Sequence, residues 1–245
     1  MLASDAALGS DTARFLCVVP NPNARFPCTR RGEVGLEEAY TLAARIREAV
    51  EQDANGSKRP IVALVDVKSQ AYGRREETAA IFLAAAASAD AYATARMKGH
   101  PVITLVVGQA ISGGFLTHGY QANRILAFDD VDVVIHAMHK EAAARITLRS
   151  VADLERLGHE IIPMSYDIRD YAKLGLLHKL LHVENPDNPA PATIGQVREE
   201  LINAIVDARA GSTDLSNHLT SEGARQTRLA GLTARNRMEK EWASA

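Results

Sequence analysis

Two short apolar runs separated by a long helical segment constrain the fold of this chain more than any other feature. Residues 61–67 and 102–107 are rich in β-branched side chains, and only Asp66 brings a charge into the first run. Such runs are typical of strands that are buried on both faces of a parallel sheet. Residues 76–98 between them are predicted to form one long helix, with acidic residues at its start and basic residues at its end, as the helix dipole favours. The succession of strand, helix and strand predicts right-handed βαβ crossovers.

The flanking segments extend this α/β pattern in both directions. Helical spacing and a capping pair at Thr193 and Gln196 predict that the last long helix begins near residue 193. We predict a core at 1–183, a proline-rich linker at 184–193, and a helical extension at 194–245 that packs on the core or on a partner. The remaining elements are predicted as strands at 15–19, 124–128, 131–136 and 176–183 and as helices at 36–50, 112–122 and 167–174.

Composition argues against several classes of function. The chain holds 28 Lys and Arg against 30 Asp and Glu, so its formal net charge of −2 gives no reason to expect nucleic acid or a membrane surface as a partner. The two cysteines, Cys17 and Cys28, have no metal-ligand spacing, and we predict no metal site. No basic start precedes an apolar run at the N-terminus, and the most apolar stretch, residues 79–87, is too short to span a membrane. A cytoplasmic location is expected.

The strongest chemical signal is a glycine turn at residues 108–115, Gly-Gln-Ala-Ile-Ser-Gly-Gly-Phe. The turn leads from a strand into a helix that begins at Ser112, where the first backbone N–H groups have no intrahelical acceptor. Gly113 and Gly114 carry no side chain that would keep a substrate carbonyl away. These N–H groups are therefore candidates for an oxyanion hole, in which one donor contributes about 3 kcal/mol to transition-state stabilisation. Tight packing of strand against helix, without a ligand, explains the same glycines.

A second polar loop follows the strand at 61–67 and includes Ser69, Gln70, Ala71, Tyr72 and Arg74. Ligands of parallel sheets bind beyond the carboxyl ends of the strands, so the two loops are expected to face one site. We expect the backbone of Gln70, Ala71 or Tyr72 to donate a further N–H group. Ser69 and Arg74 are expected to contact substrate, the arginine through a bidentate contact with a carboxylate or phosphate.

The two loops together resemble the paired oxyanion loops of the crotonase superfamily. The pattern from Asp66 to Gly73, the helix, and the Gly-x-x-x-Ser-Gly-Gly motif carry this resemblance, and residues 171–177 are similar to a superfamily Ala-x-x-x-Gly-Leu-Val signature, with Tyr171 in place of alanine. Lys68 departs from carboxyltransferase relatives, which often carry proline there. More specifically, residues 14–183 resemble the gamma subunit of biotin-independent malonate decarboxylase, through VDVKSQAYGRREE, HGYQANRILAF, VVIHAMHKEAAARITLRS and PMSYDIRDYAKLGLL.

The resemblance implies an α/β, crotonase-like stack of βαβ units with C-terminal helices. It implies a gamma subunit that acts with a beta subunit of the same fold to decarboxylate a malonyl thioester to an acetyl thioester and CO₂. The substrate would be carried on the phosphopantetheine-type group of an acyl carrier protein, with no directly bound cofactor, while an alpha subunit exchanges acyl groups. Under this resemblance His136 and Arg145, which lie in the third matching segment, are expected to bind substrate.

Two alternatives remain open on sequence. The turn before Ser112 also resembles the nucleophile turn of Clp-type serine peptidases, with His136 as the base and Asp167 or Asp170 as the group that orients it. The other alternative is a non-catalytic subunit that completes the cleft of the beta subunit.

Overall fold

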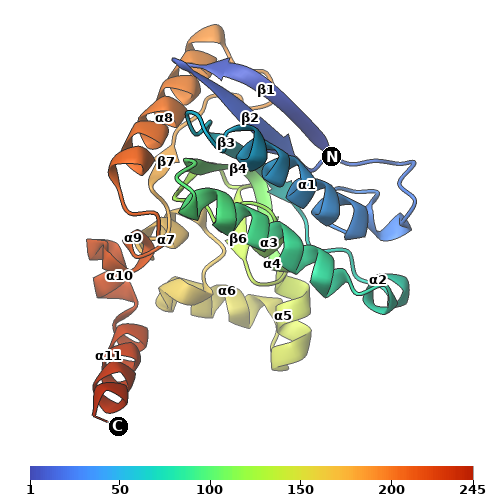
Figure 1. Cartoon of the computed structure of the whole chain (residues 1–245). Helices are drawn as coiled ribbons and strands as arrows, with labels where there is room; N and C mark the ends of the chain where they lie inside the picture. Colours follow the sequence, from blue (N-terminus) through green and yellow to red (C-terminus); the bar gives the residue numbers. More distant parts are fainter. Residues whose placement is uncertain (245) are drawn as a thin grey trace.

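The computed structural model describes residues 1–244, which form one seven-stranded sheet with helices on both faces (Figure 1). The path of the sheet is β1-β2-β3-β4-β5-β7, and β6 pairs with the far end of β4. Among the strand pairs of residues 1–244, only β1–β2 is antiparallel. The α/β class and the βαβ crossovers are therefore as predicted. The strands are β1 (Leu2–Leu8), β2 (Asp11–Cys17), β3 (Ile61–Val67), β4 (Val102–Ile111), β5 (Arg124–Phe128), β6 (Val134–His136) and β7 (Lys179–Leu181).

An N-terminal hairpin extends the sheet beyond the predicted first strand. β1 was not predicted, because its side chains are exposed except at Leu8 and carry no apolar alternation. Pairing in register with β2, from Leu2 opposite Cys17 to Leu8 opposite Asp11, holds it as an edge strand. β2 begins and ends earlier than expected at 15–19, because it must align with β3, with Arg14 opposite Ile61.

Helices α1 (Leu36–Gln52) and α3 (Ile81–Met97) pack side by side over one face of the sheet (Figure 1). The predicted single helix at 76–98 is wrong, because the chain forms α2 (Arg74–Thr78) and then turns through Ala80 in the left-handed region before α3 begins. Neither glycine nor proline marks this break in the sequence.

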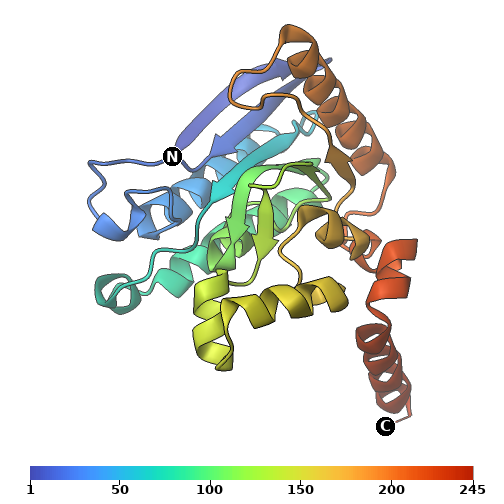
Figure 2. The same ribbon diagram turned by 180° about the vertical axis from the view of Figure 1, so that it is seen from behind.

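The opposite face of the sheet is covered by α8 (Pro191–Ala210), seen in Figure 2. Leu201, Ala204 and Ile205 of this helix lie in one apolar cluster with β-strand residues such as Val62 and Ile103. Alternate residues of each strand point to opposite faces, so α1 and α3 bury one set of side chains and α8 buries the other. Residues up to 210 thus complete the core, and the capping pair at 193 and 196 was wrong, since Ala190 caps the helix and proline begins it.

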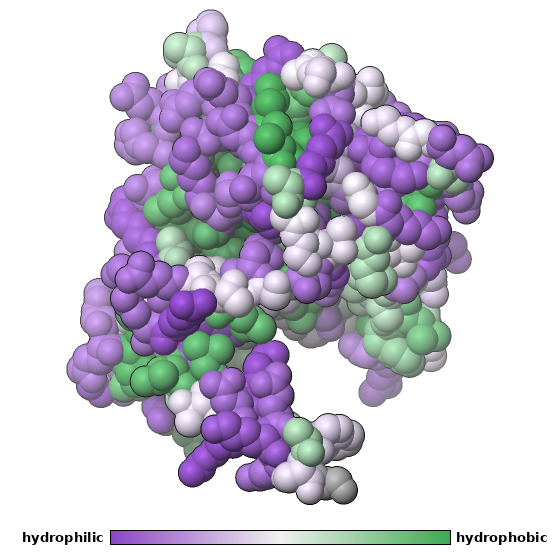
Figure 3. Space-filling model, turned by 60° about the vertical axis from the view of Figure 1, so that its left-hand side comes forward, coloured by the Kyte–Doolittle hydropathy of each residue, from purple (hydrophilic) through white to green (hydrophobic). Residues whose placement is uncertain are grey.

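The remaining helices lie near one end of the sheet or form the C-terminal segment of the chain. α4 ends earlier than the predicted residue 122. The last helix, α11, projects from the body with a largely hydrophilic surface (Figure 3) and buries none of its described side chains. Residue 245, the last of the expected extension, lies outside the described residues. Within the described part, no helix is long and apolar enough to cross a bilayer. These helices are α4 (Ser112–Thr117), α5 (Lys140–Thr147), α6 (Val151–Glu160), α7 (Ile168–Lys173), α9 (Asn217–Thr220), α10 (Glu222–Thr227) and α11 (Leu229–Ala243).

Candidate active site at the carboxyl ends of β3 and β4

β4 runs through Gly108, where the sequence predicted its end, and continues to Ile111. The pairing of β3 with β4 shifts register between Val65 and Val67. At this irregularity the Asp66 carboxylate accepts a hydrogen bond of 2.9 Å from the backbone N–H of Gln109. A Cβ atom at Gly108 would lie 2.5 Å from the same carboxylate oxygen, so glycine allows the two strands to approach here. The longer strand delivers the chain to the start of α4.

Both glycines of the turn are closely approached by the loop that follows β3. A Cβ atom at Gly114 would lie 2.6 Å from the carbonyl carbon and oxygen of Ser69, which are backbone atoms that yield only if the loop moves. A Cβ atom at Gly113 would lie 1.9 Å from the amide oxygen of Gln70, the end of a flexible side chain. Close packing therefore explains Gly114, whereas Gly113 borders a side chain that is able to rotate away.

The loop after β3 is fixed by a bridge to the segment before α1. The backbone N–H of Ala71 donates to the carbonyl of Val34 at 2.8 Å, and the N–H of Val34 donates to the carbonyl of Ser69 at 3.0 Å. Ala71, which is fully buried, therefore has no N–H group to offer a substrate, and its expected role as a donor was wrong. The Ser69 hydroxyl donates to the carbonyl of Gln70 at 2.6 Å. Because the N–H group of Ala71 is occupied, the N–H groups of Gln70 and Tyr72 are the remaining donor candidates of this loop.

The two loops meet through a pair of hydroxyl groups. The Tyr72 hydroxyl oxygen lies 2.6 Å from Oγ of Ser112, the first residue of α4. Ser112 has φ of 60°, in the left-handed region that residues other than glycine seldom adopt. The structure thus brings Tyr72 and Ser112, which are 40 residues apart in sequence, to the same edge of the sheet.

A buried histidine fastens α4 to β3 beneath this edge. His118, just after α4, accepts a hydrogen bond from the Tyr92 hydroxyl at Nδ1 (2.9 Å), and its Nε2 lies 3.1 Å from the Leu64 carbonyl, to which it donates in the neutral ring. Burial lowers the pKa of His118 to about 4, because an imidazolium would have to leave water. The neutral ring makes both hydrogen bonds and holds the helix at a fixed place.

Two hollows lie near the carboxyl ends of β4 and β6. A hollow of about 300 Å³ lies between α3 and α4 and has a largely apolar lining, to which Gln70 and Gly113 also contribute. Phe82 and Leu116 expose more than half of their side chains at its wall. A thioester or an apolar chain would fit such a surface, since few polar groups there require water.

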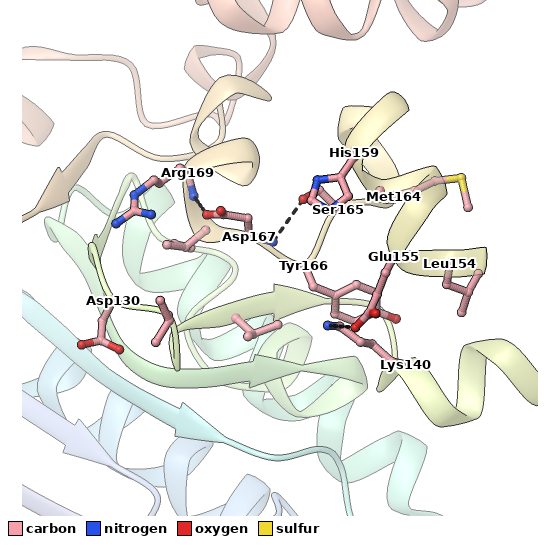
Figure 4. Close-up of a pocket in the computed structure, with 14 residues that line it drawn as sticks. Asp130, Lys140, Leu154, Glu155, His159, Met164, Ser165, Tyr166, Asp167 and Arg169 are labelled. Atoms are coloured by element: carbon pink, nitrogen blue, oxygen red, sulfur yellow. Dashed lines mark hydrogen bonds and ion pairs between the residues drawn. The ribbon is translucent and has the colours of Figure 1, made fainter. Parts of the chain in front are cut away.

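The other hollow, of about 320 Å³, lies among β6, α5, α6 and α7 and is shown in Figure 4. The polar residues of its lining include Lys140 and Glu155, which form an ion pair of 2.9 Å. Tyr166 lines the hollow and stacks on the ring of His136, with centroids 3.8 Å apart and planes inclined by 16°. Nδ1 of His136 lies 3.0 Å from the Met138 carbonyl, and burial lowers the pKa of His136. His136 therefore lies directly beside this hollow.

The serine peptidase interpretation does not fit these contacts. The partner of the Ser112 hydroxyl is Tyr72, and His136 is held by a backbone carbonyl and a tyrosine ring. Asp167 accepts a hydrogen bond from the backbone N–H of Arg169 as the cap of α7. The other carboxylate, Asp170, accepts from Ser165 at 2.8 Å and from Lys173 at 2.6 Å. Neither carboxylate is placed to orient the imidazole.

The remaining expected substrate contacts are less central. Arg74 begins α2 and Arg145 lies on α5, both with exposed side chains. Sequence reasoning missed Tyr166 and also His139, whose Nε2 lies 2.9 Å from the Lys68 carbonyl and links the loop after β6 to the loop after β3. No motif indicated either contact. In the described residues 1–244, no group of three or more His, Cys, Asp or Glu side chains is placed to hold a metal ion.

Comparison with known proteins places this arrangement in a family. A family model described as malonate decarboxylase gamma subunit matches residues 29–242. The malonyl-S-ACP:biotin-protein carboxyltransferase MADD of Malonomonas rubra is 38% identical over 139 residues, which cover 55% of this chain and 48% of that protein. The match thus spans about half the length of that curated relative.

Solved structures of a Pseudomonas malonate decarboxylase resemble the chain over nearly its whole length. The hetero-tetramer in complex with coenzyme A contains a chain that is 48% identical, with a TM-score of 0.92, and the match covers 98% of this chain and 90% of that one. The MdcD-MdcE hetero-dimer gives 48% identity and a TM-score of 0.89 at the same coverage. Transcarboxylase 12S, at 17% identity and a TM-score of 0.63, covers 86% of this chain and 36% of its own and shares the fold alone. The predicted crotonase-like fold is confirmed, and the chain belongs to the malonate decarboxylase gamma subunit family.

Proposed function

We propose that this chain acts with a beta subunit to decarboxylate a malonyl thioester carried on an acyl carrier protein, giving an acetyl thioester and CO₂. The observation that carries the proposal is the meeting of the β3 loop with the start of α4, at Ser69 with Gly114 and at Tyr72 with Ser112, in a chain of this family. The substrate would reach the site on the phosphopantetheine-type group of the carrier, with no cofactor bound directly to this chain. An alpha subunit would exchange the acyl groups.

The chemistry that the site has to supply is stabilisation of negative charge. Loss of CO₂ leaves an enolate on the thioester oxygen, and backbone N–H groups aimed at that oxygen lower the barrier without a change in oxidation state. The donors we propose are Gly113 and Gly114 of α4 together with Gln70 and Tyr72 of the loop after β3. They hold either the enolate or the departing carboxylate, while the beta subunit holds the other group.

The proposed partners agree with the relatives. The Pseudomonas structures are described as a hetero-tetramer and as a hetero-dimer of two kinds of subunit, and the Malonomonas relative is described as acting on malonyl-S-ACP. Neither nucleic acid nor a membrane is part of the proposal. Cys17 and Cys28 are free thiols, which supports the proposed cytoplasmic location, since reducing compartments keep thiols unpaired.

Substrate contacts outside the donor set follow the same geometry. Ser69 lies against Gly114, and Arg74 lies at the entrance from α2 with an exposed guanidinium group. His136 borders the hollow shown in Figure 4, and Arg145 has an exposed side chain on α5. We propose that these side chains contact the carboxylate or the carrier arm and take no part in the bond changes.

A second candidate function is that of a non-catalytic subunit that completes the cleft of the beta subunit. The observation that favours it is the packing of Gly114 on the backbone of Ser69, because that contact would require glycine even without catalysis. A substitution at Gly113 distinguishes the two functions better than one at Gly114, since the atoms nearest to an added Cβ there belong to the Gln70 side chain.

The test is a reconstitution with mass-spectrometric detection of acetyl thioester formed from malonyl thioester. This chain alone, the beta subunit alone and the two together are compared at equal concentrations. Formation of product only by the mixture supports a shared site, whereas full activity of the beta subunit alone would make this chain a scaffold. If no tube forms product, the proposed reaction is refuted.

A further inference from the structure

The hydroxyl pair of Tyr72 and Ser112 has an arrangement that packing does not explain. The two oxygens are 2.6 Å apart, at the short end of the range for O–H···O hydrogen bonds. Tyr72 exposes 57% of its surface, so the contact gains little from burial. Ser112 holds a left-handed backbone conformation that residues other than glycine seldom adopt, and such strain is concentrated at functional sites.

A count of hydrogens shows what the pair is able to donate. Each hydroxyl carries one donor hydrogen and accepts up to two hydrogen bonds. One hydrogen lies between the two oxygens, and within residues 1–244 neither hydroxyl has another hydrogen-bond partner. One O–H hydrogen is therefore left to point toward a ligand. Whichever group gives it up retains a hydrogen bond from its neighbour, which stabilises the resulting anion.

The position of the pair coincides with the place where charge would develop. Ser112 immediately precedes Gly113, and Tyr72 ends the loop that begins with Ser69 and Gln70. The same loop contacts α4 at Gly114. In a substrate whose thioester oxygen accepted hydrogen bonds from these N–H groups, the α-carbon would therefore lie close to the two hydroxyl groups.

We propose that Tyr72, with Ser112 as its hydrogen-bond partner, donates the proton that converts the enolate into the acetyl thioester. This inference rests on the proposed function. The bond between the α-carbon and the carboxylate breaks, CO₂ leaves, and the electron pair remains as the enolate. The α-carbon then takes the Tyr72 hydroxyl proton, the thioester carbonyl reforms, and the phenolate recovers a proton from water. The transfer is favourable because a phenol is a much stronger acid than the α-carbon of a thioester.

A proton donor changes how the enolate is partitioned, whereas a merely structural contact does not. The enolate either takes a proton and becomes product or recombines with CO₂ and returns to substrate. The readout is the ratio of ¹³C entering the malonyl thioester from labelled CO₂ to acetyl thioester formed, measured by mass spectrometry with the complete complex. A structural defect slows both processes and leaves this ratio unchanged.

The decisive variants are Tyr72→Phe and Ser112→Ala, with Tyr40→Phe as the matched control because Tyr40 is half exposed on α1, away from the site. We expect Tyr72→Phe to lower kcat about 100-fold or more with little change in KM, as loss of a general acid does, and to raise the label ratio. Ser112→Ala should change both quantities in the same direction by a smaller factor.

Turnover at the wild-type rate in Tyr72→Phe, or a slower rate with an unchanged label ratio, overturns the inference. Both outcomes are distinguishable from failure of the proposed function, because in that case the wild-type complex itself forms no acetyl thioester. The Tyr40→Phe complex should match wild type in both measurements.

Discussion

The buried imidazole of His118 should make the stability of this chain depend on pH with a defined sign. Its pKa is about 4 in the folded chain, because burial disfavours the charged ring, against 6.5 in the unfolded chain. Above about pH 6.5 the ring is neutral in both states, and the full stability is present. As the pH falls below 6.5 the unfolded state binds a proton that the folded state does not, so the free energy of unfolding decreases until about pH 4.

The magnitude follows from the size of this shift. One pK unit corresponds to 1.36 kcal/mol, so protonation of His118 alone removes about 3 kcal/mol between pH 6.5 and pH 4. The perturbation is His118→Gln, which retains one donor and one acceptor and does not titrate. The variant should be less stable than wild type at pH 7.5, and the difference should shrink by about 1.4 kcal/mol for each pH unit below 6.5.

Urea denaturation followed by circular dichroism at half-unit steps from pH 4.5 to 7.5 measures this difference. Other histidines that titrate on unfolding, such as the buried His218, are present in both proteins and cancel. His159→Gln, on the exposed surface of α6, is the control for the exchange of histidine for glutamine itself. If the His118→Gln and wild-type profiles are parallel, then His118 is not held neutral by burial and the reasoning is refuted.

Three further perturbations follow from contacts described above. Tyr92→Phe leaves a buried ring nitrogen without its donor and should lower the free energy of unfolding by about 1–3 kcal/mol in urea titrations. Gly114→Ala should cost about 1–3 kcal/mol through overpacking on backbone, whereas Gly113→Ala should cost less and should be relieved by Gln70→Ala; equal costs for the two glycines would contradict this. Removing residues 229–245 should leave the far-ultraviolet circular dichroism per residue and the urea midpoint nearly unchanged, because α11 buries none of its described side chains, and a large loss of stability would show that it packs on the core.

The part of the fold that sequence predicted correctly is the part whose side chains alone decide the structure. β3 and β5 lie at the predicted residues, because short continuous apolar runs are typical of strands buried on both faces. β1 escaped prediction because a polar edge strand is stabilised by backbone pairing with β2. The break at Ala80 and the bond from Ala71 to Val34 depend on tertiary contacts that a local pattern does not contain.

The candidate site likewise contains features that the sequence predicted and features that it did not. The position of the two loops after buried parallel strands correctly predicted that the loops of β3 and β4 would meet, since parallel strands end at one edge. It did not predict that the hydroxyl of Tyr72 would pair with Ser112, or that Tyr166 would stack on His136, because both contacts join segments at least 30 residues apart. The choice of Ala71 as a donor failed for the same reason.

β4 is a forked strand, because it pairs with two different strands along its length. Its first half pairs with β5, and its last residues pair with β6, where Ile111 lies opposite His136. Ile111 is the residue before Ser112, so one peptide bond separates the backbone that carries the hydroxyl pair from the rung that carries the stacked imidazole. β4 therefore joins the end of the sheet that carries the hydroxyl pair to the strand that carries the stacked ring of His136.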